Sequence, residues 1–324
     1  MDMDRTGNVI KVHAHNNILS KEEFVKEIQI RRQPAVLKGV KIGDCCEKWT
    51  PEYLMHHLGH LEAKIHVSPE SKMDFINKNF QYKTLSMAEI IKRSVKDIQE
   101  DYFINPNELY YLRSLSNERR GREVADLRKQ YPQISEDIQI PPFFDEDDFF
   151  SSVLRISSKG IQLWTHYDIM DNLLIQVQGR KRVVLFKPSD VNYLYMDGDK
   201  SRVLDIDKPD LEKFPGFLKA QKYECILEPG DILFIPALWF HNTLALTYGV
   251  AVNVFWKNLD HSLYEKNDFY GNKDLVPAAK AFQNVENAVK LLSLLPEQYK
   301  DFYLRRCMNN MCKHLNTTSH HHSK

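Results

Sequence analysis

The chain has 324 residues, of which 43% are hydrophobic and 11% aromatic. This content excludes an intrinsically disordered chain, and the length leaves room for about two domains. Because 44 Lys and Arg residues balance 44 Asp and Glu residues, the composition also excludes a generic polyanion-coating protein, although it permits a local basic face.

The cysteines and the N-terminus indicate the compartment. The five cysteines have no CxxC spacing, which fits neither a disulfide framework nor a zinc ribbon, and Cys307 and Cys312 are expected to be ordinary thiols. The N-terminus has no apolar signal region, and no run of about 18 apolar residues occurs. We therefore expect an intracellular protein, cytoplasmic or nuclear, that is neither secreted nor bound to a membrane.

Residues 1–148 predict an N-terminal α/β extension that packs on the core. Three helix starts are recognisable from N-cap residues: Ser20 with Glu23 for a helix over about 20–30, Thr50 with Pro51 for a helix through Leu58, and Ser86 with Glu89. Short apolar segments between them predict strands at 35–37, 64–67 and 109–112.

Residues 149–260 carry a different pattern, with short apolar segments separated by turns and no helical period. Pro229-Gly230 suits a type II turn, and Gly179-Arg180 suits a hairpin between two of these segments. The pattern predicts a mainly β fold with flanking helices, namely an antiparallel jelly roll (double-stranded β-helix) as the catalytic core.

Beyond residue 275 the hydrophobic period becomes helical. Apolar residues recur at spacings of three and four from Ala278 to Leu295, and Pro296 starts a second helix. Residues 275–315 thus predict a helical pair whose apolar stripe packs on the barrel or on a second copy of the chain, and we expect a homodimer. The polar tail at 316–324 is expected to be disordered.

The His166-Tyr167-Asp168 segment predicts a metal site. If it lies on a strand, alternate side chains point the same way, so His166 and Asp168 can reach one ion, and His241 can supply a third ligand. Two imidazoles and one carboxylate form the facial triad of non-heme Fe(II) oxygenases. An isolated HxD pair is more often a structural hydrogen-bonded pair, but a later histidine after an apolar strand favours the metal.

Lys181 is the second indication. It shares strand parity with Val183 and Leu185, so an inward face would bury an ammonium group, which is costly without an anion. The alternative is a solvated turn at 179–182. With the metal site present, pairing to the distal carboxylate of 2-oxoglutarate is the better interpretation.

Several motifs together resemble a known family. They are His166-x-Asp168, Lys181 nine positions after Asn172, Pro229-Gly230-Asp231, Ile235-Pro236 followed by Trp239-Phe240-His241, and Asn253-Val254-Phe255-Trp256. This set is similar to the JmjC-type (cupin-like) 2-oxoglutarate oxygenases of the small hydroxylase branch. Stretches such as WTHYDIMDNLLIQV and LFIPALWFHN, within a similarity from about 20 to 305, resemble the tRNA wybutosine-synthesizing hydroxylases in that branch.

The resemblance implies an iron- and O2-dependent dioxygenase. His166, Asp168 and His241 would bind Fe(II), and Tyr111, Asn172 and Lys181 would hold 2-oxoglutarate, with Asn253 near it. Many relatives carry Thr three residues before the first ligand histidine, where this chain has Leu163. In those relatives the threonine hydroxyl contacts 2-oxoglutarate, so here another side chain, such as Tyr111, would have to supply that contact.

The resemblance further implies a tRNA substrate. The reaction would hydroxylate the side chain of 7-(3-amino-3-carboxypropyl)wyosine at position 37, in the anticodon loop of phenylalanine tRNA, and release succinate and CO2. Basic residues and aromatic stacking commonly bind such loops. The candidates for tRNA contact are Arg119, Arg120, Arg122, Arg128, Lys129, Arg155 and Arg180.

Two other functions stay open at this point. A protein hydroxylase acting on Asn, His, Lys or Arg side chains would use the same core. A catalytically inactive jelly roll could serve as an interaction module, although the intact ligand set speaks against it. For the basic cluster at 119–129, the alternative to tRNA contact is an exposed helix face in which acids neutralise the bases.

Overall fold

The computed structural model describes residues 9–16, 20–116 and 123–315. Its helices are α1 (Lys21–Glu27), α2 (Cys45–Lys48), α3 (Pro51–Leu58), α4 (Met87–Val95), α5 (Leu127–Gln130), α6 (Val276–Leu292) and α7 (Glu297–Leu315). The strands of the N-terminal part are β1 (Ile10–Lys11), β2 (His13–Asn16), β3 (Ala35–Lys38), β4 (Glu62–Ser68), β5 (Gln81–Ser86) and β6 (Leu109–Arg113). The later strands are β7 (Phe149–Ser157), β8 (Asp171–Gln178), β9 (Lys181–Phe186), β10 (Met196–Asp197), β11 (Lys200–Ser201), β12 (Tyr223–Leu227), β13 (Ile232–Ile235), β14 (Phe240–Ala245) and β15 (Gly249–Trp256).

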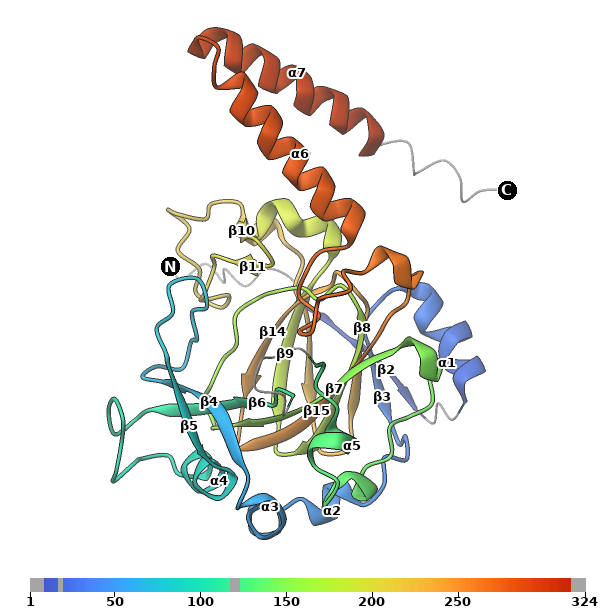
Figure 1. Ribbon diagram of the computed structural model, residues 1–324, viewed down its shortest axis with the longest axis vertical. Coiled ribbons are helices and arrows are strands. Elements are labelled where there is room, and N and C mark those ends of the chain that lie inside the picture. Colours follow the sequence, from blue (N-terminus) through green and yellow to red (C-terminus); the bar gives the residue numbers. More distant parts are fainter. Residues whose placement is uncertain (1–8, 17–19, 117–122, 316–324) are drawn as a thin grey trace, which may run out of the picture. The chain divides into compact units, whose positions relative to one another are not determined.

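Two sheets form the barrel (Figure 1). Within the described ranges, the major sheet has nine strands in the order β2-β3-β13-β8-β15-β7-β6-β4-β5. The minor sheet has four, in the order β1-β12-β9-β14. Apolar residues of the major sheet, among them Leu174 and Leu233, pack on Val183 and Leu185 of the minor sheet. The predicted mainly β jelly roll with flanking helices is confirmed, and β2 to β6 extend its major sheet.

The turn at Gly179-Arg180 differs from the prediction. It joins β8 of the major sheet to β9 of the minor sheet, so these strands are not paired and the predicted hairpin is wrong. Gly179 has a φ of 71°, and a Cβ there would lie 1.9 Å from the carbonyl oxygen of Tyr248. Glycine is therefore needed for a sharp corner between sheets. The turn at Pro229-Gly230 is confirmed, since Gly230 has a φ of 90°.

The largest apolar core lies between the outer face of the major sheet and the N-terminal helices (Figure 1). Phe24 of α1 stacks on Phe143 with ring centroids 4.5 Å apart and meets Trp256 of β15 edge to face. Alternate residues of the same strands point into the barrel, where many are polar. Because the outer face supplies this core, the barrel interior can hold polar groups for a site.

The N-terminal helices begin where their cap residues predict. The Ser20 hydroxyl accepts a hydrogen bond from the Glu23 amide, and the Glu23 carboxylate accepts one from the Ser20 amide, which completes a capping box before α1. The Thr50 and Ser86 hydroxyls cap α3 and α4 by accepting hydrogen bonds from the amides of Tyr53 and Glu89. A cap of this kind stabilises a helix by about 1 kcal/mol.

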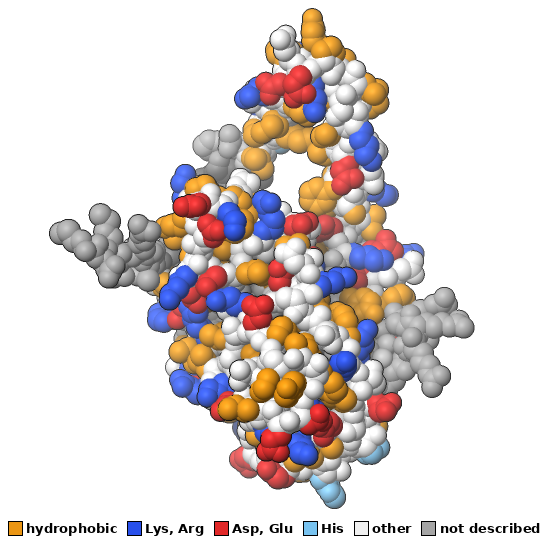
Figure 2. Space-filling view, turned by 90° about the vertical axis from the view of Figure 1, so that its left-hand side faces the viewer, with side chains coloured by type: hydrophobic (Ala, Val, Ile, Leu, Met, Phe, Trp, Pro, Cys, Tyr) orange, Lys and Arg blue, Asp and Glu red, His pale blue; other side chains and the backbone are white. Residues whose placement is uncertain are grey.

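The chain divides into two compact units. The first spans residues 1–260 and 267–272 and contains the barrel; the second spans 261–266 and 273–324 and contains α6 and α7. The predicted helical pair is present, and no residue of either helix, both described in full, is buried. Figure 2 shows hydrophobic side chains gathered along the pair. None of the helices in the described ranges has the length and apolarity needed to cross a bilayer.

The predicted disordered tail at 316–324 and the candidates Arg119, Arg120 and Arg122 lie outside the described residues. All five cysteines are free thiols, and Cys307 and Cys312 are exposed on α7.

Candidate active site

His166, Asp168 and His241 come together just before β8 and at the start of β14. One potential ligand atom from each lies within 4.8 Å of the others. Nε2 of His241 lies 3.5 Å from Oδ2 of Asp168, and the two imidazole centroids are 4.3 Å apart. The spacing suits three ligands on one side of a single metal ion.

Backbone pairing holds these residues in place. The His241 amide donates to the His166 carbonyl at 2.8 Å and the His166 amide to the His241 carbonyl at 3.2 Å, while the Leu238 amide donates to the Asp168 carbonyl at 2.8 Å. The prediction that the HxD segment lies on a regular strand is wrong, because His166 forms only isolated bridges and Asp168 is irregular. The bridge between His166 and His241, and not the alternation of side chains along a strand, brings the ligands together.

Hydrogen bonds set the state of both imidazoles. Nδ1 of His166 lies 3.0 Å from the Trp164 carbonyl oxygen, and Nδ1 of His241 lies 3.1 Å from that of Trp239. A carbonyl only accepts, so each Nδ1 carries a proton, and in the neutral ring Nε2 is then the nitrogen with the lone pair. Burial, and then the neighbouring His241, lowers the pKa of His166 to about 3. A neutral imidazole with a free Nε2 is the state that binds a metal, so these residues fit one.

An ion pair between a half-buried arginine and a buried aspartate, which the sequence analysis missed, supports the His241 loop. The Arg32 guanidinium donates to both carboxylate oxygens of Asp171 at 2.7 and 2.6 Å, and Asp171 has no exposed surface. Asp171 also accepts from the Ala237 amide at 2.9 Å, and Trp239 donates its indole N–H to the Arg32 carbonyl at 2.9 Å. Asp171 is a lone acid at the start of an apolar segment, but nothing local identifies a partner 139 residues away.

Lys181 is buried, as its strand parity predicted, with 7% of its surface exposed. No acid of the described chain lies within ion-pair distance of its ammonium group. Burial, and then the charge of Arg155, lowers the pKa of Lys181 to about 7. A buried ammonium group is costly without an anion, so this lysine favours an anionic ligand.

Polar side chains from the four strands β6, β7, β8 and β15 form a connected group in the barrel. Asn253 donates to the side-chain oxygen of Asn172 at 3.0 Å, and Arg155 donates to the side-chain oxygen of Asn253 and to the Tyr111 hydroxyl. Lys181 pairs in register with Ala245, which packs in one cluster with Tyr111 and Leu163. The residues expected at 2-oxoglutarate thus lie in one region of the interior.

Leu163 lies in that apolar cluster together with Tyr111. It offers no hydroxyl, whereas the Tyr111 hydroxyl is held by Arg155 at the cavity wall. This arrangement suits the expectation that the Tyr111 hydroxyl makes the contact to 2-oxoglutarate that Leu163 cannot make.

A cavity of about 370 Å³ is lined by two of the three ligand residues, His166 and Asp168. Its aromatic lining includes Phe75 and Trp164, whose ring centroids are 3.7 Å apart. The indole N–H of Trp164 is buried and has no acceptor among the described residues. The charged and polar lining residues are Lys64, His66, Arg113, Arg155, His166, Asp168, Asp199, Lys200 and Asn272. Such a cavity can hold a flat aromatic group that carries negative charge.

The described tRNA candidates lie in different places. Arg128 and Lys129 are exposed on α5 and lie 3.6 and 3.8 Å from Asp126, and Arg180 pairs with Glu228 at 2.8 Å. Arg180 also follows the end of β8 that is remote from Asp168. Arg155 lines the cavity and contacts Tyr111 and Asn253. The candidates thus do not form one basic patch, and their contact with tRNA stays a prediction.

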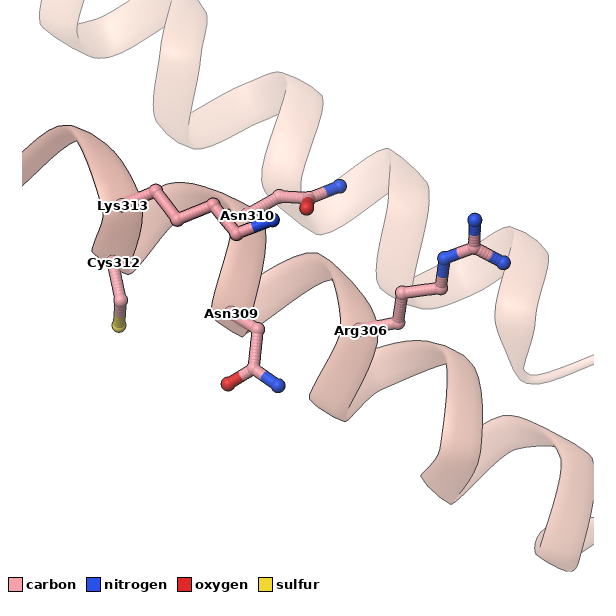
Figure 3. Close-up of a pocket in the computed structure, with 5 residues that line it drawn as sticks. All are labelled: Arg306, Asn309, Asn310, Cys312 and Lys313. Carbon is pink, nitrogen blue, oxygen red and sulfur yellow. The ribbon is translucent and has the colours of Figure 1, made fainter.

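A second hollow lies along α7 (Figure 3). Its lining comes from that one helix and consists of Arg306, Asn309, Asn310, Cys312 and Lys313. Figure 3 shows their side chains pointing in different directions. The hollow is therefore an open helix surface without a convergent set of groups.

Comparisons with known proteins agree with this geometry. A family model described as a cupin-like domain matches residues 20–262. The chain is 57% identical over 288 residues to "tRNA wybutosine-synthesizing protein 5" of Danio rerio, a match covering 89% of this chain and 88% of that protein. It is 54% identical over 288 residues to the protein of the same name in Homo sapiens, covering 89% of this chain and 91% of that protein. "tRNA wybutosine-synthesizing protein 4" of Gibberella zeae is 37% identical over 300 residues, which are 90% of this chain but 28% of that protein. The chain belongs to the cupin-like domain family and, within it, to the family of tRNA wybutosine-synthesizing protein 5.

Proposed function

We propose that the protein is an Fe(II)- and 2-oxoglutarate-dependent hydroxylase of the wybutosine-precursor side chain at position 37 of phenylalanine tRNA. The observation that carries this proposal is the cluster of His166, Asp168 and His241 in a barrel that also holds a buried lysine with no counter-ion among the described residues. The wybutosine names of the relatives support the choice of pathway.

The ligand set favours iron among the common metals. Two imidazoles and one carboxylate on one side of an ion leave coordination positions open, as in non-heme Fe(II) oxygenases. When bound, Fe(II) with 2-oxoglutarate and O2 supplies the oxidising power that hydroxylates an unactivated C–H bond and releases succinate and CO2. The protein contributes the orientation of the ligands through the carbonyls of Trp164 and Trp239 and the ion pair behind the His241 loop.

The position of Lys181 suits the far carboxylate of 2-oxoglutarate. His241 pairs with Leu185 on β9, and Lys181 lies four residues earlier on that strand, about 13 Å away along it. A lysine side chain and a five-carbon dicarboxylate together can bridge that distance. Lys181 and the Tyr111 hydroxyl would donate to the carboxylate, while the amides of Asn172 and Asn253 form the wall beside it.

The aromatic lining favours a nucleobase over an aliphatic protein side chain. Phe75 and Trp164 present a wall next to His166, and the buried indole N–H needs an acceptor such as a base heteroatom. Base–aromatic stacking contributes about 1–3 kcal/mol per base. This wall would hold the modified base while its side chain extends toward the metal ligands.

We further propose that the protein is a homodimer through α6 and α7. Their apolar side chains are widely exposed, with Leu291 at 67% and Phe302 at 58%. A helix pair with an uncovered apolar stripe gains stability by burying it, and a second copy supplies a matching surface.

The proposal is tested in cells and with purified protein. Phenylalanine tRNA from cells that lack the protein should contain no hydroxylated wybutosine, as measured by mass spectrometry of digested tRNA. The purified protein with Fe(II) and ascorbate should consume 2-oxoglutarate; Asp168→Ala should abolish this turnover, whereas Asp197→Ala, at an exposed position on β10, should not. Undiminished turnover in Asp168→Ala would refute the metal site, and unchanged hydroxywybutosine in the cells would favour a protein substrate.

A further inference from the structure

Two arginines face each other across neighbouring strands inside the cavity. Arg113 of β6 is the register partner of Arg155 of β7, and both line the cavity beside Asp168. Directly opposed like charges on one face of a sheet destabilise it. The pair therefore needs negative charge from elsewhere.

Neither arginine has an ion-pair partner among the residues that the structure describes. Arg155 donates to Asn253 and to Tyr111, which are uncharged. Arg113 donates to the Tyr270 carbonyl at 3.0 Å and lies 5.8 Å from the centroid of the Tyr270 ring. No carboxylate of the described chain lies within 4 Å of either guanidinium. An arginine has five N–H donors, so most of those of Arg113 stay available.

The bound metal and cosubstrate do not remove this excess. The cavity lining carries Lys64, Arg113 and Arg155 against the single carboxylate of Asp168, while Lys200 is neutralised by Asp199. A divalent iron and a dianionic 2-oxoglutarate cancel each other. Two positive charges remain, and the substrate is the remaining source of an anion.

The geometry of the substrate points to Arg113. In a 3-amino-3-carboxypropyl chain, every carbon lies within three bonds of the carboxylate carbon. If any of them is hydroxylated at the metal, the carboxylate must lie inside the cavity and close to the metal ligands. Arg155 is already engaged by Tyr111 and Asn253, whereas among the described residues only Tyr270 accepts a hydrogen bond from the Arg113 guanidinium.

We propose that Arg113 binds the side-chain carboxylate of the modified base, and that Tyr270 holds the guanidinium in position for it. This inference rests on the proposed function and names the group by which the site recognises its substrate. The same chemistry could come from a backbone phosphate of the tRNA, so the experiment must separate the two anions.

The test compares two substrates and two variants. The substrates are phenylalanine tRNA bearing the free amino-acid side chain and the same tRNA with that carboxylate methyl-esterified, and binding is measured without O2 alongside turnover. The wild-type protein should bind the free acid at least about tenfold more tightly than the ester, because an ion pair with paired hydrogen bonds is lost. Arg113→Gln should weaken binding of the free acid by about 10- to 100-fold and abolish the preference, while Arg113→Lys should retain part of it.

Matched measurements keep the outcome interpretable. Lys83→Gln removes a cation that also lies over an aromatic ring, that of Phe103 at 4.9 Å, but outside the cavity lining, so it should leave the preference intact. A wild-type protein that does not distinguish acid from ester would overturn the proposal without any variant. Equal weakening of both substrates by Arg113→Gln would assign the residue to a phosphate and also overturn it. Failure of the wild-type protein to hydroxylate either tRNA would instead overturn the proposed function.

Discussion

Replacing Lys181 by Met should stabilise the ligand-free protein. Burial and Arg155 lower the pKa of Lys181 from 10.5 to about 7, and at about 1.4 kcal/mol for each pKa unit this difference corresponds to about 5 kcal/mol. That value is the free-energy cost of keeping the ammonium charged in the folded protein. Methionine has a similar length and no charge, so Lys181→Met removes the cost.

The sign of the pH dependence follows from the lowered pKa. Below about pH 7 the lysine is protonated in both states, and the folded protein bears the full cost. Between pH 7 and 10.5 the unfolded chain binds the proton that the folded protein has lost, so the free energy of unfolding rises with pH. The advantage of Lys181→Met should therefore be greatest near pH 6.5, at up to about 5 kcal/mol, and should disappear toward pH 10.

The same lysine should link 2-oxoglutarate binding to pH. An anion binds the protonated form, so the Kd should rise by up to about tenfold per pH unit above pH 7, with proton uptake on binding. Calorimetry without O2 in buffers of different ionisation enthalpy measures both quantities, and urea denaturation without small anions measures the stability. Lys187→Met, at a partly exposed lysine just after β9, is the control and should change neither. A less stable Lys181→Met at pH 6.5, or a Kd independent of pH in the wild-type protein, would refute the reasoning.

Three further predictions concern the support of the site, its wall and its assembly. Asp171→Asn should weaken metal binding by about 10- to 100-fold, because the His241 loop loses its charged anchor to Arg32; an unchanged metal affinity in a dye-competition titration would contradict that role. Trp164→Ala should weaken tRNA binding by about 1–3 kcal/mol with little effect on 2-oxoglutarate binding, measured by fluorescence titration, and equal losses for both ligands would argue against stacking. Sedimentation at low concentration should show a dimer that Phe302→Asp converts to a monomer; a wild-type monomer would remove the proposed interface.

The sequence predicted those features that depend on local pattern. The helix N-caps, the helical period after residue 275 and the parity of Lys181 depend on neighbours within a few residues, and all three agree with the structure. The turn at Gly179-Arg180 was misassigned because its length is the same whether it joins paired strands or the two sheets.

Contacts between residues far apart in the chain could not be predicted from local sequence patterns. His166 and Asp168 converge through a bridge to His241 and not through strand parity. The Arg32–Asp171 ion pair and the opposed Arg113 and Arg155 arise from strand order, which no local pattern encodes. Charged residues in such positions look like ordinary surface residues until the register is known.

The origin of the added oxygen tests the central claim most directly. The purified protein is incubated with Fe(II), 2-oxoglutarate, isotopically labelled O2 and phenylalanine tRNA bearing the precursor base, and the digested nucleoside and the succinate are analysed by mass spectrometry. A 2-oxoglutarate-dependent hydroxylase should place one labelled oxygen atom in the nucleoside and the other in succinate, and Asp168→Ala should place none in either. A nucleoside that stays unmodified, or that gains its oxygen from water, would contradict the account.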